Sequence, residues 1–428
     1  MKGSEKLMLN KDGQRELAYV VRIDDIKPIP GRDRVECAVV GGWTCMVPVG
    51  VFQPGGLGIY FEIDSKLDTS KPEFAFTEKY HGKIKTQKFA LKDAEGNKIG
   101  DFYSQGLLMS PQDFGWTIHA DTYGITIVAE AETGGLEAFE EGDFLTTKLG
   151  VTYYDPEDDK RKSNRNNPNA KYQRMMNRHP KLAKSRFGRW CMKHTFAKKL
   201  LYLILGGDKK NGVKNFPSHI VKTDEERVQN CFSHMHSINT KWIVTEKRDG
   251  TSTTMSLKGH DKKQEYFVCS RNVVMTNRKD GSWYDVNVYT EMADKYSIKN
   301  VLEDLLTDEY EFVTIQGETF GEGIQKRDYG LKEHVFEAFN VIFGYKDGTT
   351  KRLNPIEMKK LMDKYNVPTV PIVATDVTLP DTCEEVLTMA SGEAAIYGGM
   401  REGLVFRSID GIHSFKAVDN DFLLKYHG

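Results

Sequence analysis

The sequence predicts an α+β protein in which a small β-barrel domain precedes a mixed α/β domain of antiparallel sheets and helices. Residues 1–150 contain short strand-like runs divided by glycine and proline, whereas residues 216–428 alternate between strand and helix patterns. Residues 151–215 form a basic linker with one amphipathic helix. The 428 residues suffice for two or three domains of roughly 100–200 residues each. A composition of 39% hydrophobic and 28% charged residues excludes a wholly disordered or collagen-like chain.

The first 150 residues carry four candidate strands. Turn signals at Pro28–Gly31, Gly41–Gly42 and Pro54–Gly56 separate them. The strands are expected at Leu17–Asp24, Val35–Val40, Thr44–Val49 and Leu57–Ile63. Several short strands with glycine between them are typical of a small barrel.

The middle of the chain is strongly basic. Residues 160–199 hold 14 of the 60 Lys and Arg and no acidic residue, which leaves 46 basic against 61 acidic residues elsewhere. This asymmetry favours a polyanionic partner, with a solvated linker as the alternative. Apolar and small residues also recur here at helical spacing and predict one continuous amphipathic helix. We expect this helix to dock on the protein rather than on a membrane, and to end at Gly206 and Gly207. The residues on its face are Phe187, Trp190, Cys191, His194, Ala197, Leu201 and Ile204.

The C-terminal half mixes helices and strands. Thr223 and Glu226 have the spacing of a capping box, which predicts a helix from about residue 224 to 233. Further helices are expected at Asn354–Tyr365 and Cys383–Ser391. The expected strands are Lys241–Glu246, Glu265–Ser270, Glu311–Gly317, His334–Phe343, Gly403–Arg407 and His413–Val418.

Lys247 ends a candidate strand and is followed by Asp249 and Gly250. A lysine in this position places an amine at the floor of a cleft. An amine that attacks phosphorus must be uncharged, and burial or neighbouring cations lower its pKa from the usual value of about 10.4. Taken alone, the pattern also fits a hairpin with a surface lysine, because Asp-Gly is a common turn pair.

Further blocks follow Lys247 in a fixed order. They are Ser270-Arg271-Asn272, Gln316–Gly321, Phe336–Asn340, Glu402–Arg407 and His413–Val418. The ordered set resembles the covalent nucleotidyltransferase superfamily of polynucleotide ligases and capping enzymes. No GxxxxGK[ST] phosphate loop and no HExxH zinc motif competes with it.

Two other stretches narrow the resemblance to the RNA ligase 5 family. Blocks between Pro30 and Leu107 resemble the N-terminal OB domain of that family, and Lys222–Asn230 resembles the entry into its catalytic domain. Only 12 residues follow Lys416, too few for the C-terminal OB domain of DNA ligases and capping enzymes. The expected domains are an OB-like barrel at 1–150, the basic linker at 151–215 and a nucleotidyltransferase domain at 216–428.

The resemblance implies a role for each site residue. Lys247 would attack the α-phosphate of ATP and form a lysyl–AMP, while Lys416 and Arg407 neutralise phosphate charge. Glu402 would hold a divalent Mg or Mn ion. Related RNA ligases commonly carry a lysine two positions before Lys416, where this chain has Ser414.

Four more residues would bind the nucleotide, together with Lys416. Glu318 would accept a hydrogen bond from the ribose, and Phe339 would stack on adenine. Glu246 would lie near the adenine edge, and Arg271 would contact the ribose or the incoming phosphate. For each there is a plainer alternative, because Phe336 and Phe339 also fit a strand core and Arg271 a surface salt bridge.

The interpretation that follows is an ATP-dependent RNA ligase that joins 3'-OH and 5'-phosphate ends, with nicked duplex RNA or an RNA/DNA hybrid as substrate. The alternatives are a DNA ligase, a capping guanylyltransferase, and an inactive nucleic-acid-binding relative. Six scattered cysteines without a CxxC pair favour a reduced, cytoplasmic setting, and the absence of a long apolar run or leader argues against a membrane. We also expect a monomer. We expect the basic segment to contact RNA phosphates, so charge reversal at Arg174, Arg178, Lys181 and Lys184 should weaken substrate binding but spare self-adenylylation.

Overall fold

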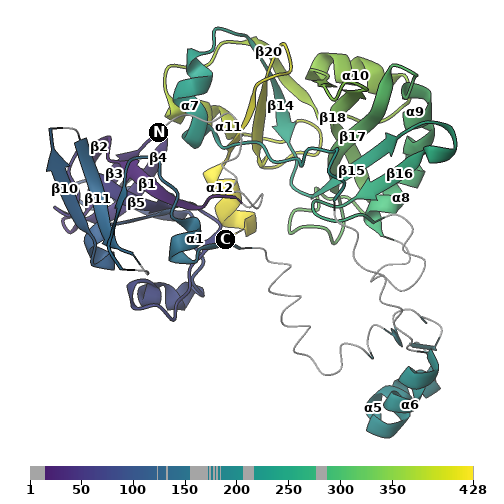
Figure 1. Cartoon of the computed structure of the whole chain (residues 1–428), viewed down its shortest axis with the longest axis horizontal. Coiled ribbons are helices and arrows are strands. Elements are labelled where there is room, and N and C mark those ends of the chain that lie inside the picture. Colours follow the sequence, from purple (N-terminus) through teal and green to yellow (C-terminus); the bar gives the residue numbers. More distant parts are fainter. Residues whose placement is uncertain are drawn as a thin grey trace. The chain divides into compact units, whose positions relative to one another are not determined.

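The computed structural model describes residues 15–122, 124–131, 134–154, 172, 175–176, 179, 182–183, 185–205, 216–275 and 287–427. Gly206 and Gly207, and the four basic residues named for charge reversal, lie outside these ranges. The chain divides into two compact units (Figure 1). Unit 1 consists of Met1–Tyr154, Asp224–Asp249 and Val370–Gly428, and unit 2 of Asp155–Thr223 and Gly250–Thr369. In the described part of the chain, no helix has the length and apolar character to cross a membrane.

The N-terminal part of unit 1 is built from small antiparallel sheets, as the sequence predicts. Two three-stranded sheets have the orders β1-β5-β9 and β2-β3-β4, a third contains β10, β11 and β12, and the pairs β7–β8 and β6–β13 complete the set. The first sheets contain β1 (Ala18–Arg22), β5 (Leu57–Phe61), β9 (Leu107–Met109), β2 (Asp25–Pro28), β3 (Val35–Val40) and β4 (Trp43–Pro48). The others contain β6 (Ser65–Lys66), β7 (Gln87–Lys92), β8 (Lys98–Ser104), β10 (Thr117–Asp121), β11 (Gly124–Glu130), β12 (Leu136–Phe139) and β13 (Thr152–Tyr153). Short helices lie at Pro72–Tyr80, Pro111–Phe114 and α1 (Thr146–Leu149).

Strand β1 is buried on both faces, because alternate side chains enter two different apolar clusters. Ala18 and Val20 pack with Ile59 and Phe61, whereas Tyr19 and Val21 belong to the cluster around Trp43 and Tyr60. This two-sided burial explains the nearly continuous apolar run in the sequence of β1.

The rest of unit 1 is an antiparallel sheet of order β20-β14-β21-β22, on which α7 and α11 pack. Its strands are β14 (Trp242–Lys247), β20 (Ile372–Val377), β21 (Gly403–Ser408) and β22 (Ser414–Val418). Its helices are α7 (Val228–Ser237), α11 (Cys383–Ala390) and α12 (Asn420–Phe422), which continues into a terminal π-helical turn at Leu423–His427. Trp242, Phe406 and Phe415 are fully buried between this sheet and the helices.

The predicted capping box is wrong. Helix α7 begins at Val228 rather than near residue 224, and the Glu226 side chain accepts hydrogen bonds from Arg227 N and Asn230 Nδ2. The main chain is extended at Arg227 instead, where Lys416 N donates to Glu226 O at 2.7 Å and Arg227 forms a parallel bridge with Lys416. A long-range strand contact therefore overrides the local helix signal.

Unit 2 contains a five-stranded antiparallel sheet of order β16-β15-β17-β18-β19 (Figure 1). The strands are β15 (Thr251–Lys258), β16 (Glu265–Cys269), β17 (Tyr310–Phe320), β18 (Val335–Tyr345) and β19 (Thr350–Arg352). Helices α8 (Val288–Lys295), α9 (Ile298–Leu305) and α10 (Pro355–Asp363) pack against it, and a short 3₁₀ turn lies at Asp261–Lys263. Met255, Leu302 and Val313 are fully buried in the shared core.

The single amphipathic helix expected in the basic linker is also wrong, because the structure has two helices. Helix α5 (Arg186–Lys193) and helix α6 (Thr195–Leu205) are broken at His194, whose φ of −106° and ψ of 120° are extended. Cys191 and Leu201 are buried as expected, but Phe187 and Ile204 are 59% and 70% exposed. Because the chain leaves helical geometry at His194, the helical spacing of α5 does not continue into α6, and one continuous apolar face cannot form.

Candidate active site

Lys247 is the last residue of β14, and its Nζ lies 2.8 and 2.9 Å from the two carboxylate oxygens of Glu402. Glu402 immediately precedes β21, whose Gly403 pairs with Lys247 across the sheet. A Cβ on Gly403 would lie only 2.2 Å from Ala417 O, so this position requires glycine if β21 and β22 are to approach. The close packing of these strands holds the buried carboxylate against the lysine.

Burial raises the pKa of Glu402, and the neighbouring Asp249 charge raises it further, while Lys247 opposes both effects. Asp249 in turn pairs with His427 Nε2 at 3.1 Å. That hydrogen bond raises the pKa of His427. Two acids and two bases thus meet at the end of β14, and no sequence pattern pointed to His427.

A second group of cations lies on β21 and β22. Lys416 Nζ is 2.7 Å from Asp224 Oδ1, and Arg407 Nη2 is 3.1 Å from Glu225 Oε1. The Ser414 hydroxyl donates to the same glutamate, so the serine at the position usually held by lysine binds the acid that pairs with Arg407. Burial lowers the pKa of Lys416, and Asp224 opposes this.

A cluster of buried polar side chains connects the N-terminal barrel to strand β22, which carries Lys416. Glu62 accepts hydrogen bonds from Arg15 at 2.6 Å and from Asn230 Nδ2 at 2.8 Å. Asn230 Oδ1 accepts one from Trp43 Nε1 at 2.6 Å, and Asn230 Nδ2 also donates to Glu226. Because Glu226 O receives the Lys416 main-chain N–H, the cluster holds the backbone of the Lys416 strand.

Sequence reasoning missed this cluster and one more cation. Arg227 forms the main-chain bridge with Lys416, and its charge lowers the pKa of that lysine. It is 7% exposed and lies 3.7 Å from Asp64. A buried arginine beside Lys416 adds positive charge where phosphates are expected to bind.

Glu246 is fully buried and has protein partners for both oxygens. One accepts from Arg248, and the other accepts from Ala395 N at 2.6 Å. Arg248 also lies over the Tyr397 ring, 4.9 Å from its centroid. Glu246 thereby ties β14 to the loop before β21.

Strands β14 and β15 belong to different sheets, which excludes the simple hairpin as an interpretation of the Asp249-Gly250 pair. Gly250 instead permits a close approach in unit 2, because a Cβ there would lie 2.4 Å from Thr319 O and 3.0 Å from Glu318 Cγ. The glycine therefore serves packing beside Glu318. Glu318 itself lies on β17, opposite Ser252 of β15 and Glu337 of β18.

Phe339 occupies a β-bulge. Gln316 pairs with Asn340 and Gly317 with Ala338, so Phe339 is the extra residue of β18. A bulge re-aims side chains, and such bulges are common next to active sites. Phe336 is fully buried in the core, whereas Phe339 is half-buried, which separates the two phenylalanines that the sequence could not tell apart. Arg271 follows β16 and is exposed.

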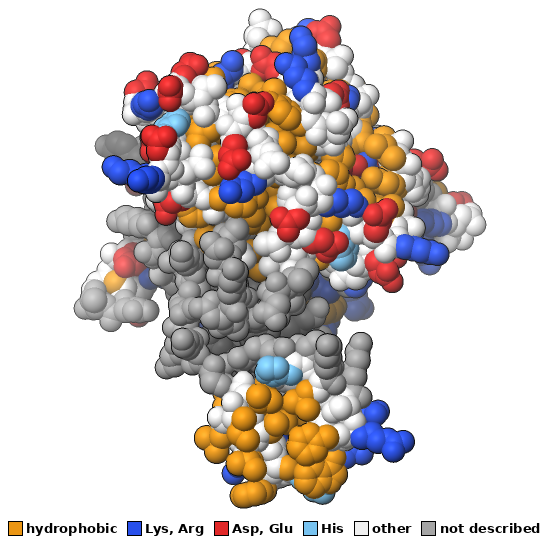
Figure 2. Space-filling view, turned by 90° about the vertical axis from the view of Figure 1, so that its right-hand side faces the viewer, with side chains coloured by type: hydrophobic (Ala, Val, Ile, Leu, Met, Phe, Trp, Pro, Cys, Tyr) orange, Lys and Arg blue, Asp and Glu red, His pale blue; other side chains and the backbone are white. Residues whose placement is uncertain are grey.

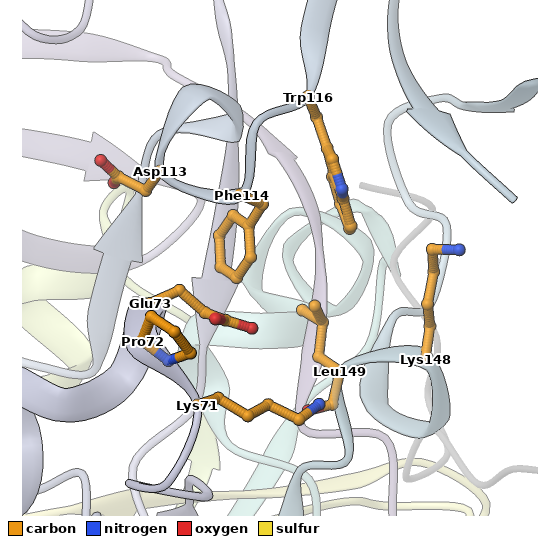
Figure 3. Close-up of a pocket in the computed structure, with 8 residues that line it drawn as sticks. All are labelled: Lys71, Pro72, Glu73, Asp113, Phe114, Trp116, Lys148 and Leu149. Atoms are coloured by element: carbon orange, nitrogen blue, oxygen red, sulfur yellow. The ribbon is translucent and has the colours of Figure 1, made fainter. Parts of the chain in front are cut away.

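Unit 1 also has a pocket of about 290 Å³ on the barrel (Figure 3). Its lining residues lie between Lys71 and Leu149, so none of them is a predicted site residue. Phe114 and Trp116 form an aromatic wall, with ring centroids 5.2 Å apart. Lys71 donates to Leu149 O at 3.0 Å, and Lys148 pairs with Glu137. Two lysines and two acids line it, so the pocket has no strong preference for an anion.

The carboxylates of Glu402 and Asp249 could hold a divalent ion only if a bound substrate supplied further ligands. Among the described residues, no group of three or more His, Cys, Asp or Glu side chains could hold a metal. Glu402 and the nearby Asp249 supply two carboxylates. Mg²⁺ is commonly held by one or two carboxylates together with substrate phosphates and water, and these two residues suit that arrangement.

Comparison with known proteins agrees with this organisation. An RNA ligase family model matches residues 240–427, and an OB-fold domain model matches residues 17–111. No curated protein sequence matches the chain.

Solved structures of one ligase resemble the whole chain. The Naegleria gruberi RNA ligase with PPi is 26% identical with a TM-score of 0.65, covering 96% of this chain and 99% of that chain. A variant of the same ligase with ATP and Mn is 26% identical with a TM-score of 0.63, covering 96% and 98%. Another with AMP and Mn is 27% identical with a TM-score of 0.65, covering 96% and 99%. This chain therefore has the two domains of an RNA ligase, an OB-fold domain in its N-terminal part and an RNA ligase domain in its C-terminal part.

Proposed function

We propose that this chain is an ATP-dependent RNA ligase that joins a 3'-OH end to a 5'-phosphate end through a lysyl–AMP intermediate. The observation that carries the proposal is Lys247 at the end of β14, held by the buried Glu402 within the RNA ligase domain. Solved relatives that bind ATP, AMP or PPi support it.

In the first step the Lys247 amine attacks the α-phosphorus of ATP. The N–P bond forms, the bond from the α-phosphorus to the bridging oxygen breaks, and pyrophosphate leaves with the electron pair. Lys247 must lose a proton first, and Glu402 lies within hydrogen-bond distance of its Nζ, with a pKa raised by burial. This arrangement both orients the amine and offers a nearby proton acceptor.

Lys416 and Arg407 would neutralise the charge that develops on the phosphates. Lys416 on β22 pairs with Val405 of β21, and β21 pairs in turn with β14, the strand of Lys247. Its pairing with Asp224 keeps the ammonium buried and oriented. A bound Mg²⁺ or Mn²⁺ would supply further charge neutralisation on the triphosphate, and Glu402 and Asp249 would hold it.

Residues of unit 2 would bind the nucleoside. Glu318 would accept a hydrogen bond from the ribose, Phe339 would stack on adenine from its bulge, and Arg271 would contact the ribose or the incoming phosphate. Glu246 is assigned to the adenine edge, with its buried contacts fixing the adjacent loop.

In the later steps AMP passes from Lys247 to the RNA 5'-phosphate and forms a 5'–5' pyrophosphate linkage. The 3'-OH then attacks the 5'-phosphate, and AMP leaves as a phosphodiester forms. We propose nicked duplex RNA or an RNA/DNA hybrid as the substrate and a monomer as the working form. The six free cysteines favour a reducing, cytoplasmic setting.

The test is incubation with α-labelled ATP and Mg²⁺ or Mn²⁺, followed by a sealing assay on nicked duplexes with RNA or DNA on each side. The wild type should become covalently labelled and seal ends with an RNA 3'-OH, whereas Lys247→Ala should take up no label. Labelling of that variant would exclude Lys247 as the nucleophile. Labelling by GTP, or equal sealing of all-DNA nicks, would favour the capping or DNA ligase alternative.

A further inference from the structure

Helices α5 and α6 form a small helical module with its own core. Met175, Met176, Cys191 and Leu201 are buried together, and Tyr172 packs on Tyr202 with ring centroids 5.4 Å apart. The N-cap Ser185 accepts a hydrogen bond from Gly188 N at 2.9 Å. These contacts account for one side of α5 and leave the other side facing outward.

The outward side combines aromatic rings with cations. Phe187 and Trp190 are 59% and 52% exposed, and their rings are nearly parallel, with centroids 6.2 Å apart and planes at 25°. Exposed Arg186, Arg189 and Lys193 lie on the same helix. Figure 2 shows the apolar face of this module with blue Lys and Arg side chains along its edge. We call these five residues the α5 surface.

Charge identifies the class of partner for the α5 surface. Residues 186–205 contain five Lys and Arg and no acidic residue. Exposed aromatic rings bordered by cations are the features with which proteins bind single strands of nucleic acid, because bases stack on the rings while phosphates pair with the cations. On the basis of the proposed function, we infer that the α5 surface binds a single-stranded part of the RNA substrate.

The placement of the cations favours RNA over a lipid surface. A helix that lies in a membrane interface carries its cations on the polar face, opposite its Trp, Phe and Leu side chains. Here the aliphatic end of α6, residues 200–205, has no charged residue, and its Leu203 and Ile204 are 81% and 70% exposed. The cations of α5 accompany the stacked rings instead. This division provides a matched control, because α5 and the end of α6 can be altered separately.

The experiment compares two double variants of the full chain. Phe187→Ala/Trp190→Ala removes the rings, and Leu203→Ser/Ile204→Ser removes an aliphatic pair that is even more exposed. Binding of a fluorescently labelled single-stranded RNA is measured by anisotropy over a salt series. Binding to vesicles of phosphatidylserine and phosphatidylcholine is measured in parallel. Self-adenylylation checks that the catalytic half is intact, since none of these residues is assigned to it.

We expect the ring variant to bind RNA roughly 5- to 150-fold more weakly, which is the loss of one stacked base at about 1–3 kcal/mol converted to affinity. The aliphatic variant should bind RNA like the wild type. Arg189→Gln should flatten the salt slope of RNA binding by about 0.7 units, the change expected for one phosphate contact on a single strand. In each variant self-adenylylation should stay at the wild-type level.

Three results would overturn the inference. One is unchanged RNA affinity in the ring variant. Another is vesicle binding that depends on Leu203 and Ile204 while RNA binding depends on neither pair. A third is loss of RNA binding on Trp116→Ala alone, which would place the strand at the barrel pocket of Figure 3. A wild-type protein that takes up no label from ATP would instead refute the proposed function and leave the RNA-binding measurement standing on its own.

Discussion

The two units differ in what they bury. In unit 1 the sheet that carries Lys247 also carries ion pairs with a buried cation and a partly exposed acid, namely Lys416 with Asp224 and Arg407 with Glu225. In unit 2 the sheet packs on an apolar core, and its buried polar side chains are mainly neutral, as in the pair Thr253–Thr319 at 2.7 Å. The charged side chains that we propose for phosphoryl transfer therefore lie in unit 1, whereas unit 2 buries mainly apolar and neutral side chains.

This difference has an energetic consequence. A buried ion pair is a weak source of stability, but removing one partner leaves an uncompensated charge and costs several kcal/mol. Changes of charge in unit 1 should therefore disturb both chemistry and folding. Changes of shape in unit 2 should act mainly on nucleotide affinity.

The largest effect is expected from Glu402→Ala in unit 1. This variant removes the partner of Lys247 and one of the two carboxylates assigned to the metal. The rate of lysyl–AMP formation should fall at least about 100-fold, in the range seen when one group that stabilises a transition state is removed. Single-turnover labelling measures it, and the exposed Glu384 on α11 gives the control Glu384→Gln, which should label normally. A loss of less than tenfold would contradict the assignment of Glu402.

The second largest effect is expected at the buried polar cluster of Arg15, Glu62 and Asn230, between the barrel and strand β22. Arg15→Met leaves Glu62 buried without its cation and should cost about 3–5 kcal/mol of unfolding free energy. Urea unfolding measures this loss. The control is Arg22→Met, because Arg22 and Glu141 are 38% and 29% exposed and such a pair contributes about 1 kcal/mol or less. Equal losses in the two variants would show that the cluster is no more than a surface contact.

In unit 2, Phe339→Ala should raise the KM for ATP roughly tenfold and change kcat much less, because a stacking platform binds the ground state and the transition state alike. Steady-state adenylylation kinetics separate the two constants. The comparison variant is Phe336→Leu at the buried neighbour, which should lower the melting temperature and leave the KM near that of the wild type. The reverse pattern would make Phe339 a core residue.

The sequence was most informative where function depends on contiguous residues. Lys247, Glu318, Glu402 and Lys416 each lie in a block that can be recognised without knowing the fold. The structure places Lys247 on β14, Glu402 just before β21 and Lys416 on β22, which are neighbouring strands of one sheet. The acids at 224 and 225, which pair with Lys416 and Arg407, suggested a helix start instead.

What could not be predicted depends on contacts distant in the chain. Asn230 meets Trp43 across a separation of 187 residues, and His427 meets Asp249 across 178, so no local pattern encodes either pair. The break between α5 and α6 is at His194, without a glycine or proline to mark it. No local sequence pattern marks the bulge at Phe339 either, because the bulge is defined only by the register of β18 against β17.

The smallest expected effect is a difference in pH response between the units. Burial lowers the pKa of His219 in unit 2 to about 4, from an ordinary value of 6.5, and the Lys258 charge adds to this. Its unfolded form therefore binds a proton more readily, so stability should fall as the pH drops from 6.5 towards 4. In unit 1 the hydrogen bond to Asp249 raises the pKa of His427 above 6.5. The stability from this pair is complete below pH 6.5 and is lost as the pH rises through the higher, folded pKa.

Unfolding free energies at pH 5, 6.5 and 8.5 separate the two histidines. His219→Gln should reduce the loss of stability on the acid side and leave the alkaline side unchanged, whereas His427→Gln should do the opposite. The exposed His119 on β10 provides the control His119→Gln, which should follow the wild type at every pH. If His219→Gln and His427→Gln changed the same side of the profile, the contrast between an apolar and an ionic setting would be wrong for these two residues. Opposite changes would show that each unit imposes its own electrostatics on the same side chain.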